Sequence, residues 1–168
     1  MARAPVLPDL LKPGLRLVFC GTAAGTVSAA RGAYYAHPQN KFWRVLHEVG
    51  LTPEQLTPEE YRRLWDYGIG LTDIAKHAFG MDRELPRGAL GADAVAALRG
   101  RIAETRPGIL AFTSLTGGRR VMGSKAVFGQ QTEKLGDSQV WIMPSPSPTA
   151  HWNWDVSLWR GLAKAARS

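Results

Sequence analysis

Four short apolar runs constrain the fold of this chain more than any other feature. They cover residues 15–21, 68–74, 108–114 and 139–144. Runs of this length and composition are typical of strands that are buried on both faces of a sheet. Segments with helical spacing alternate with them, which indicates parallel strands with helices on both sides. We therefore predict an α/β fold, a three-layer α/β/α sandwich around a central, mostly parallel sheet of four strands.

Three of the intervening segments carry apolar residues at helical spacing. The first lies in residues 40–50, where Gly50 is placed to end the helix. In the last of these segments, the basic residues Arg160, Lys164 and Arg167 are free to face solvent or phosphate. The three apolar stripes are Phe42, Val45, Leu46 and Val49; Ala92, Val95, Leu98 and Ile102; and Trp154, Leu158, Leu162 and Ala165.

The length of 168 residues suits one compact domain that spans the whole chain, 1–168. A single cysteine, Cys20, excludes an internal disulfide and any multi-cysteine metal site. No apolar run approaches the roughly 20 residues that cross a bilayer, and residues 1–8 lack the apolar core of a secretory signal. We expect a monomeric, cytoplasmic protein, nucleoid-associated if bacterial, that uses no metal or cofactor and has no membrane partner.

The charge of the chain favours a polyanionic partner. Its net charge is +7, from 21 basic and 14 acidic residues. A basic surface gains affinity for nucleic acid because each phosphate that it neutralises releases condensed counterions. The net positive charge favours nucleic acid as a class of partner but does not identify the partner.

Two segments at the carboxyl ends of predicted strands carry the candidate chemistry, because open α/β sheets bind ligands at that edge. The first is Gly-Thr-Ala-Ala-Gly at 21–25, whose glycines let the backbone approach a ligand closely and offer N–H donors to it. The second is Met-Pro-Ser-Pro-Ser-Pro-Thr-Ala-His-Trp at 143–152. Its prolines make a stiff loop whose hydroxyl groups suit a phosphate backbone.

In this order along the chain, these segments resemble the mismatch-specific uracil/thymine-DNA glycosylases. The resemblance rests on residues 9–25, on Tyr-Ala-His-Pro-Gln-Asn-Lys-Phe-Trp-Arg-Val-Leu at 35–46, on Tyr-Gly-Ile-Gly-Leu-Thr-Asp at 67–73, and on residues 143–147. The Asn-x-Phe-Trp segment is also similar to the hypoxanthine-DNA glycosylase branch. The resemblance implies a monofunctional glycosylase that flips uracil out of DNA and excises it, leaving an abasic site.

The same resemblance implies a set of base-binding residues. Tyr35 would stack its ring on the flipped base. Core packing or edge burial is the alternative for this side chain, and the neighbouring Tyr34 is the alternative for the stacking role. Backbone N–H groups of the turn would hydrogen-bond the base carbonyls and stabilise the departing anion. His37 would donate to the base or to a phosphate. The residues of the turn are Gly21, Thr22, Ala23, Ala24 and Gly25.

The catalytic position departs from the family, because Ala23 stands where relatives carry an Asn or Asp that orients water. Asn40 is one replacement, although an Asn before Lys-Phe-Trp is also a good helix N-cap. Asp73 follows a strand end and is the second candidate, with a solvated or salt-bridged carboxylate as its alternative. No lysine is placed as a Schiff-base nucleophile, so no lyase step is predicted.

The second segment implies contacts to the DNA backbone through Ser145, Ser147, Thr149 and His151. Relatives often carry Leu at the position of Ser147, where it enters the vacated base stack, and Ser is a poor wedge. His151 and Trp152 are the alternatives for that role. Arg119 and Arg120 are further candidate phosphate contacts, or else part of an exposed charged helix face.

Three other functions stay open at this point. A deaminated purine such as hypoxanthine is an alternative base, and Ala23 is also compatible with a non-catalytic binder of abasic sites or lesions. An unrelated doubly wound nucleotide-binding domain lacks support, because the chain has neither GxGxxG nor a phosphate-loop lysine.

Overall fold

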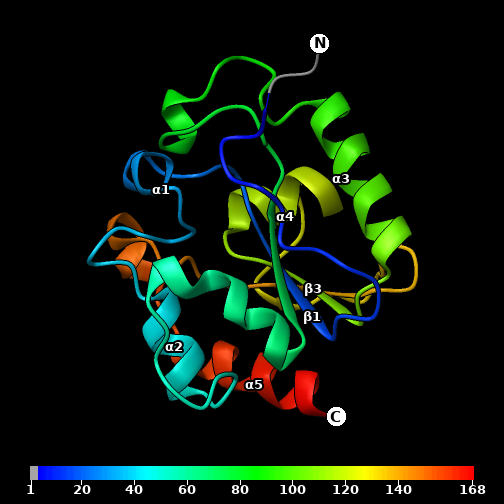
Figure 1. Cartoon of the computed structure of the whole chain (residues 1–168). Coiled ribbons are helices and arrows are strands. Elements are labelled where there is room, and N and C mark those ends of the chain that lie inside the picture. Colours follow the sequence, from blue (N-terminus) through cyan, green and yellow to red (C-terminus); the bar gives the residue numbers. More distant parts are fainter. Residues whose placement is uncertain (1–3) are drawn as a thin grey trace.

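The computed structural model describes residues 4–168, with the side chains of His151 and Trp152 excepted. Its centre is a five-stranded sheet in the order β2-β1-β3-β5-β4 (Figure 1). Four strands run parallel, namely β1 (Leu17–Gly21), β2 (Ile69–Asp73), β3 (Ile109–Phe112) and β5 (Gln139–Ile142). Each of the four apolar runs is therefore a strand, and the predicted α/β fold is confirmed.

The prediction of four strands is wrong by one edge strand. β4 (Gly129–Gln130) pairs antiparallel with β5. It has only two residues, one of them a glycine with a φ of 99°. A strand this short has no periodicity that a sequence pattern can detect.

Helices cover both faces of the sheet, as predicted (Figure 1). Neighbouring residues of β1 show the two layers, because Leu17 and Phe19 belong to one core cluster and Val18 and Cys20 to the other. The first cluster includes residues of α2 (Phe42–Glu48), η1 (Pro58–Tyr67) and α5 (Val156–Arg167). The second includes residues of α3 (Ala92–Thr105) and α4 (Leu115–Met122). The remaining helices are α1 (Thr26–Arg31), η2 (Asp82–Glu84) and η3 (Pro148–Asn153).

Of the predicted apolar stripe of the last helix, Leu162 is fully buried, and Trp154, Leu158 and Ala165 are half-buried against the core. Trp154 precedes α5, which begins after Asp155 accepts a hydrogen bond from the Ser157 N–H at 2.9 Å. The bulk of Trp159 sets the rotation of the helix, because this side chain is fully buried and stacks on Phe19 with a centroid distance of 5.7 Å. The buried residues of α5 are Trp159, Leu162, Ala163 and Ala166.

The basic residues of α5 are exposed, as expected. Arg160 forms an ion pair with Glu48 at 3.6 Å, and Arg167 donates a hydrogen bond to the Val49 carbonyl at 3.1 Å. Within residues 4–168, no helix combines the length and the apolar character that crossing a membrane requires.

Candidate active site

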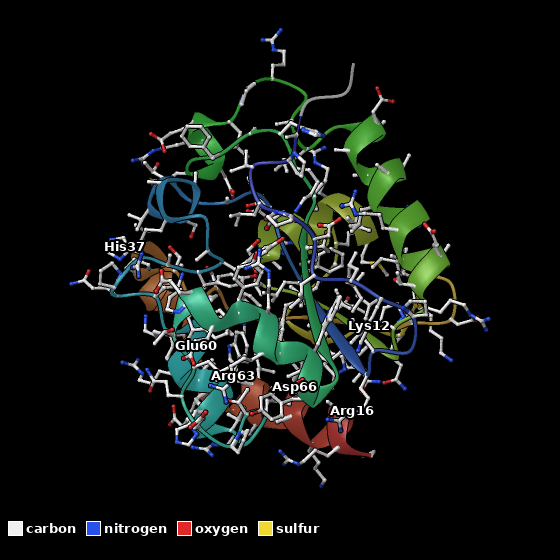
Figure 2. All side chains as sticks on the ribbon, viewed as in Figure 1. Lys12, Arg16, His37, Glu60, Arg63 and Asp66 are labelled. Carbon is white, nitrogen blue, oxygen red and sulfur yellow. The ribbon has the colours of Figure 1, made fainter. Side chains whose placement is uncertain are left out.

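A cavity of about 740 Å³ lies at the carboxyl ends of the parallel strands. Its wall comes from the turn after β1, the segment before α2, the end of β2, residues 80–83, the loop from β3 into α4, and the loop from β5 into η3. Figure 2 shows His37 at the outer edge of the molecule, on the side where η3 lies. The predicted site residues in the wall are Gly21, Thr22, Ala23, Ala24, Gly25, Tyr35, His37, Asn40, Asp73, Ser145, Ser147 and Thr149.

Asp73 is a buried carboxylic acid in this wall, with 4% of its surface exposed. It pairs in register with Gly21 across β1 and β2. No residue in the described part of the chain donates a hydrogen bond to its carboxylate. Burial, opposed by the nearby charge of Lys76, raises the pKa of Asp73 to about 6. The group is therefore poised to exchange a proton near neutral pH.

Close to Asp73, the carboxylate of Asp9 forms ion pairs with Lys76 and Arg101. The Asp9 carboxylate contacts Lys76 Nζ at 2.8 Å and Arg101 Nε at 3.4 Å, and it accepts a hydrogen bond from Thr72 at 2.7 Å. Arg101 also donates to the backbone carbonyl of Asp73 at 2.8 Å. Lys76 and Arg101 lower the pKa of Asp73 and Asp9 raises it, so the effect of burial, the largest of these, prevails.

Tyr35 lines the cavity wall. Its backbone adopts the left-handed conformation, with a φ of 51°. One face of the ring stacks on Phe42, with centroids 3.9 Å apart and planes 18° apart. The phenol oxygen and the Thr113 hydroxyl lie 3.0 Å apart. Burial raises the pKa of Tyr35 well above its usual value, so the phenol stays neutral. The ring is thus partly core and partly cavity wall.

Asn40 uses its side-chain oxygen at the start of α2, where Oδ1 accepts a hydrogen bond from the Phe42 N–H at 2.9 Å. The capping alternative for this residue is therefore present. Asn40 also lines the cavity, and its Nδ2 donates to none of the described residues. Its catalytic role stays a prediction.

The loop after β5 brings three hydroxyl groups to the cavity. The hydroxyl groups of Ser147 and Thr149 lie 3.0 Å apart, and the Ser147 N–H donates to Ser145 Oγ at 3.2 Å. The loop is joined to the segment before α2 by a hydrogen bond from the Lys41 N–H to the Pro146 carbonyl at 2.9 Å. The side chain of His151, the fourth predicted contact, lies outside the described residues.

The structure does not bring Arg119 and Arg120 into the cavity wall. Both are exposed on α4, whose first residues, Leu115 and Thr116, line the cavity instead. The Arg119 Nε donates to the Ala126 carbonyl at 2.8 Å. Their contact with phosphate stays a prediction.

Three parts of the wall were not anticipated from the sequence. Thr113 follows β3 directly, so the strand-end rule could have found it. Asn153 lines the cavity with a buried Oδ1 that has no hydrogen-bond partner among the described residues. Residues 80–83 join the wall through a hydrogen bond from Thr22 Oγ1 to Asp82 Oδ1 at 2.6 Å. No sequence signal indicates either of the last two.

Comparison with known proteins gives a family and a similar structure for this chain. The family model of the uracil DNA glycosylase superfamily matches residues 8–162. This chain belongs to the uracil DNA glycosylase superfamily. The solution NMR structure of a proposed uracil DNA glycosylase from Methanosarcina acetivorans is also similar, with a TM-score of 0.67 and 18% sequence identity over 96% of this chain and 97% of that chain. This likeness shows the fold of the superfamily, and membership supports a DNA glycosylase that acts on DNA.

Proposed function

We propose that this superfamily member hydrolyses the N-glycosidic bond of uracil in DNA and leaves an abasic site. The observation that carries the proposal is Asp73, a buried carboxylate in the cavity wall that no described residue engages by a hydrogen bond. A buried acid without a protein partner is costly, and such groups concentrate at functional sites. Asp73 therefore takes the role that Ala23 cannot perform.

The chemistry requires a positioned water and stabilisation of an oxocarbenium-like state. With a pKa of about 6, the Asp73 carboxylate is ionised in roughly a tenfold excess at pH 7. In that form it accepts a hydrogen bond from water, orients its attack on the sugar carbon, and takes up the proton released. Its negative charge also favours the positive charge that develops on the sugar.

The turn after β1 supplies donors for the departing base. The carbonyls of Gly21, Thr22 and Ala24 accept hydrogen bonds from Ile74, Ala75 and Gly80, which fixes the turn. The N–H groups of Thr22 and Ala23 donate to no acceptor among the described residues, although both residues line the cavity. Free N–H groups at this place suit the oxygen of a uracil anion, whose charge grows as the bond breaks.

A deaminated purine is the second candidate base. The small side chains of Ala23 and Ala24 in the wall, and a cavity of about 740 Å³, leave room for two fused rings. Hypoxanthine carries the same carbonyl–N–H pattern that the turn would recognise in uracil. The two bases are therefore compared in one experiment.

The test is base release from labelled oligonucleotides, single- and double-stranded, that carry uracil, hypoxanthine or a G·T mismatch. We expect uracil release by the wild type and a loss of about a hundredfold or more in Asp73→Asn. Asp137→Asn is the matched control, because this carboxylate is exposed and pairs only with Arg106 at 3.2 Å. Wild-type protein that binds these strands and releases no base would overturn the proposal and indicate a lesion-binding protein.

A further inference from the structure

Two exposed apolar side chains lie close together at the rim of the cavity. Phe79 is 53% exposed and Met81 is 38% exposed, and the other large exposed apolar residues between residues 4 and 168 are Trp65 and Val127. Single exposed apolar residues are common on protein surfaces. Phe79 and Met81 differ from such isolated residues, because they lie on either side of Gly80 and because Gly80 and Met81 line the cavity.

The segment that carries these side chains is fixed to the base-binding turn. Phe79 forms a parallel β-bridge with Ala24, and the Gly80 N–H donates to the Ala24 carbonyl at 2.8 Å. Thr22 Oγ1 donates to Asp82 at 2.6 Å, and the Met81 N–H donates to Glu84 Oε1 at 2.8 Å. The backbone that carries the aromatic ring is therefore held in place relative to the base-binding turn.

One cation of this segment is available to a nucleic-acid partner. The carboxylates of Asp82 and Glu84 accept hydrogen bonds from within the protein. Arg83, which lines the cavity, is exposed and forms no hydrogen bond or ion pair with the described residues. A guanidinium group without a protein partner is available to a phosphate beside the cavity.

Base extrusion leaves a gap in the duplex that an apolar side chain fills in many proteins. Ser147 does not suit this task, because its hydroxyl is paired with Thr149 at 3.0 Å. In Figure 1, η2 and η3 lie on the same side of the molecule, with α1 between them.

We infer that Phe79, supported by Met81, enters the base stack of duplex DNA when the cavity takes up the flipped nucleotide. The inference rests on the proposed function, since only an enzyme or binder that extrudes a base needs this insertion. It assigns the contact with the duplex interior to residues 79–81, and it leaves phosphate contacts to the loop after β5. Single-stranded DNA has no stack to fill, so the role of Phe79 is specific to duplexes.

The test compares Phe79→Ala, Met81→Ala and Phe79→Leu with the wild type on single- and double-stranded uracil substrates. We expect Phe79→Ala to lower kcat/KM on duplex DNA by about tenfold or more, with less than about a twofold change on single strands. Phe79→Leu should recover most of the duplex activity, because a leucine also wedges. Val127→Ala is the matched control, since Val127 is 63% exposed and lies outside the cavity wall.

A second readout does not depend on catalysis. A duplex with a tetrahydrofuran abasic analogue next to 2-aminopurine reports unstacking by an increase in fluorescence. We expect the wild type to raise this signal and Phe79→Ala, at saturating protein, to leave it low. Equal losses of activity on single and double strands, or an unchanged fluorescence response, would overturn the inference. Absent base release together with a response that depends on Phe79 would overturn the proposed function and retain the insertion.

Discussion

Gly21 and Asp73 are register partners at the ends of β1 and β2, and the missing side chain of Gly21 leaves the space that the Asp73 carboxylate occupies. A Cβ atom on Gly21 would lie 2.6 Å from Asp73 Oδ1, and 3.6 Å from both the Tyr35 and the Thr113 hydroxyl oxygens. A contact of 2.6 Å requires one of the two groups to move. The glycine is thus needed for the position of the acid.

The first prediction concerns this space. Gly21→Ala should displace the carboxylate and lower kcat/KM for base release by about a hundredfold, because small misplacements at a reacting centre are costly. Steady-state kinetics on uracil-containing single strands measures the effect. Gly100→Ala, in α3 with no atom near the added Cβ, should leave activity unchanged. Full activity of Gly21→Ala would show that the carboxylate position does not matter.

The second prediction is the pH dependence of base release. Asp73 must be ionised to act, and its pKa is about 6, so kcat should rise between pH 5 and pH 7 and then level off. Single-turnover rates across this range give the midpoint. A rate that is flat from pH 5 to pH 7 would remove Asp73 from the role of base.

The third prediction concerns stability. The pKa of Asp73 is raised from 3.8 to about 6 by folding, so the folded state binds a proton more tightly than the unfolded state. The stability that this proton contributes is present below about pH 4 and is lost as the pH rises through 6. Asp73→Asn does not lose this contribution and should be more stable than the wild type at pH 7 by about 3 kcal/mol. Urea unfolding at pH 4 and pH 7 tests this, and a difference of equal size at both values would contradict it.

The fourth prediction separates the two roles of Asn40. Asn40→Ser keeps an acceptor for the Phe42 N–H, whereas Asn40→Ala removes it and should cost about 1 kcal/mol of unfolding free energy. If Nδ2 helps to hold the attacking water, both variants should lose about tenfold in kcat. Wild-type activity in Asn40→Ser would leave Asn40 with the capping role alone.

The fifth prediction concerns Asn153. Its Oδ1 is buried in the cavity wall without a partner, so Asn153→Leu should leave the melting temperature unchanged or raise it. If the amide reads the edge of the bound base, the same change should raise KM for base release more than it lowers kcat. Thermal melting and steady-state kinetics, with Val127→Ala as control, measure both effects.

The sequence predicted the sheet because β1, β2, β3 and β5 are short, mostly apolar runs that are buried over nearly their whole length. It did not predict β4, which is held by pairing with β5 rather than by its own two residues. The expected stripe of the last helix included Leu162 but missed Trp159, Ala163 and Ala166, which complete the buried face of α5; Trp159 packs there on Phe19.

Most of the candidate site was predictable because strand ends converge in parallel sheets, and both Gly21 and Asp73 end predicted strands. Their direct pairing was not predictable, since periodicity does not give the register between strands. The segment around Phe79 was missed for another reason. Exposed apolar residues in a loop have no repeat, and only the bridge to Ala24 places them beside the cavity.

Asp9 lies outside the cavity wall, yet its charge contributes to the raised pKa of Asp73. It also pairs with Lys76 and Arg101, whose positive charges act in the opposite direction and favour ionisation of Asp73. The acidity of Asp73 is therefore governed in part by Asp9, more than sixty positions away in sequence. We therefore expect substitutions in this amino-terminal segment to shift the pH dependence of base release while the residues of the cavity wall stay the same.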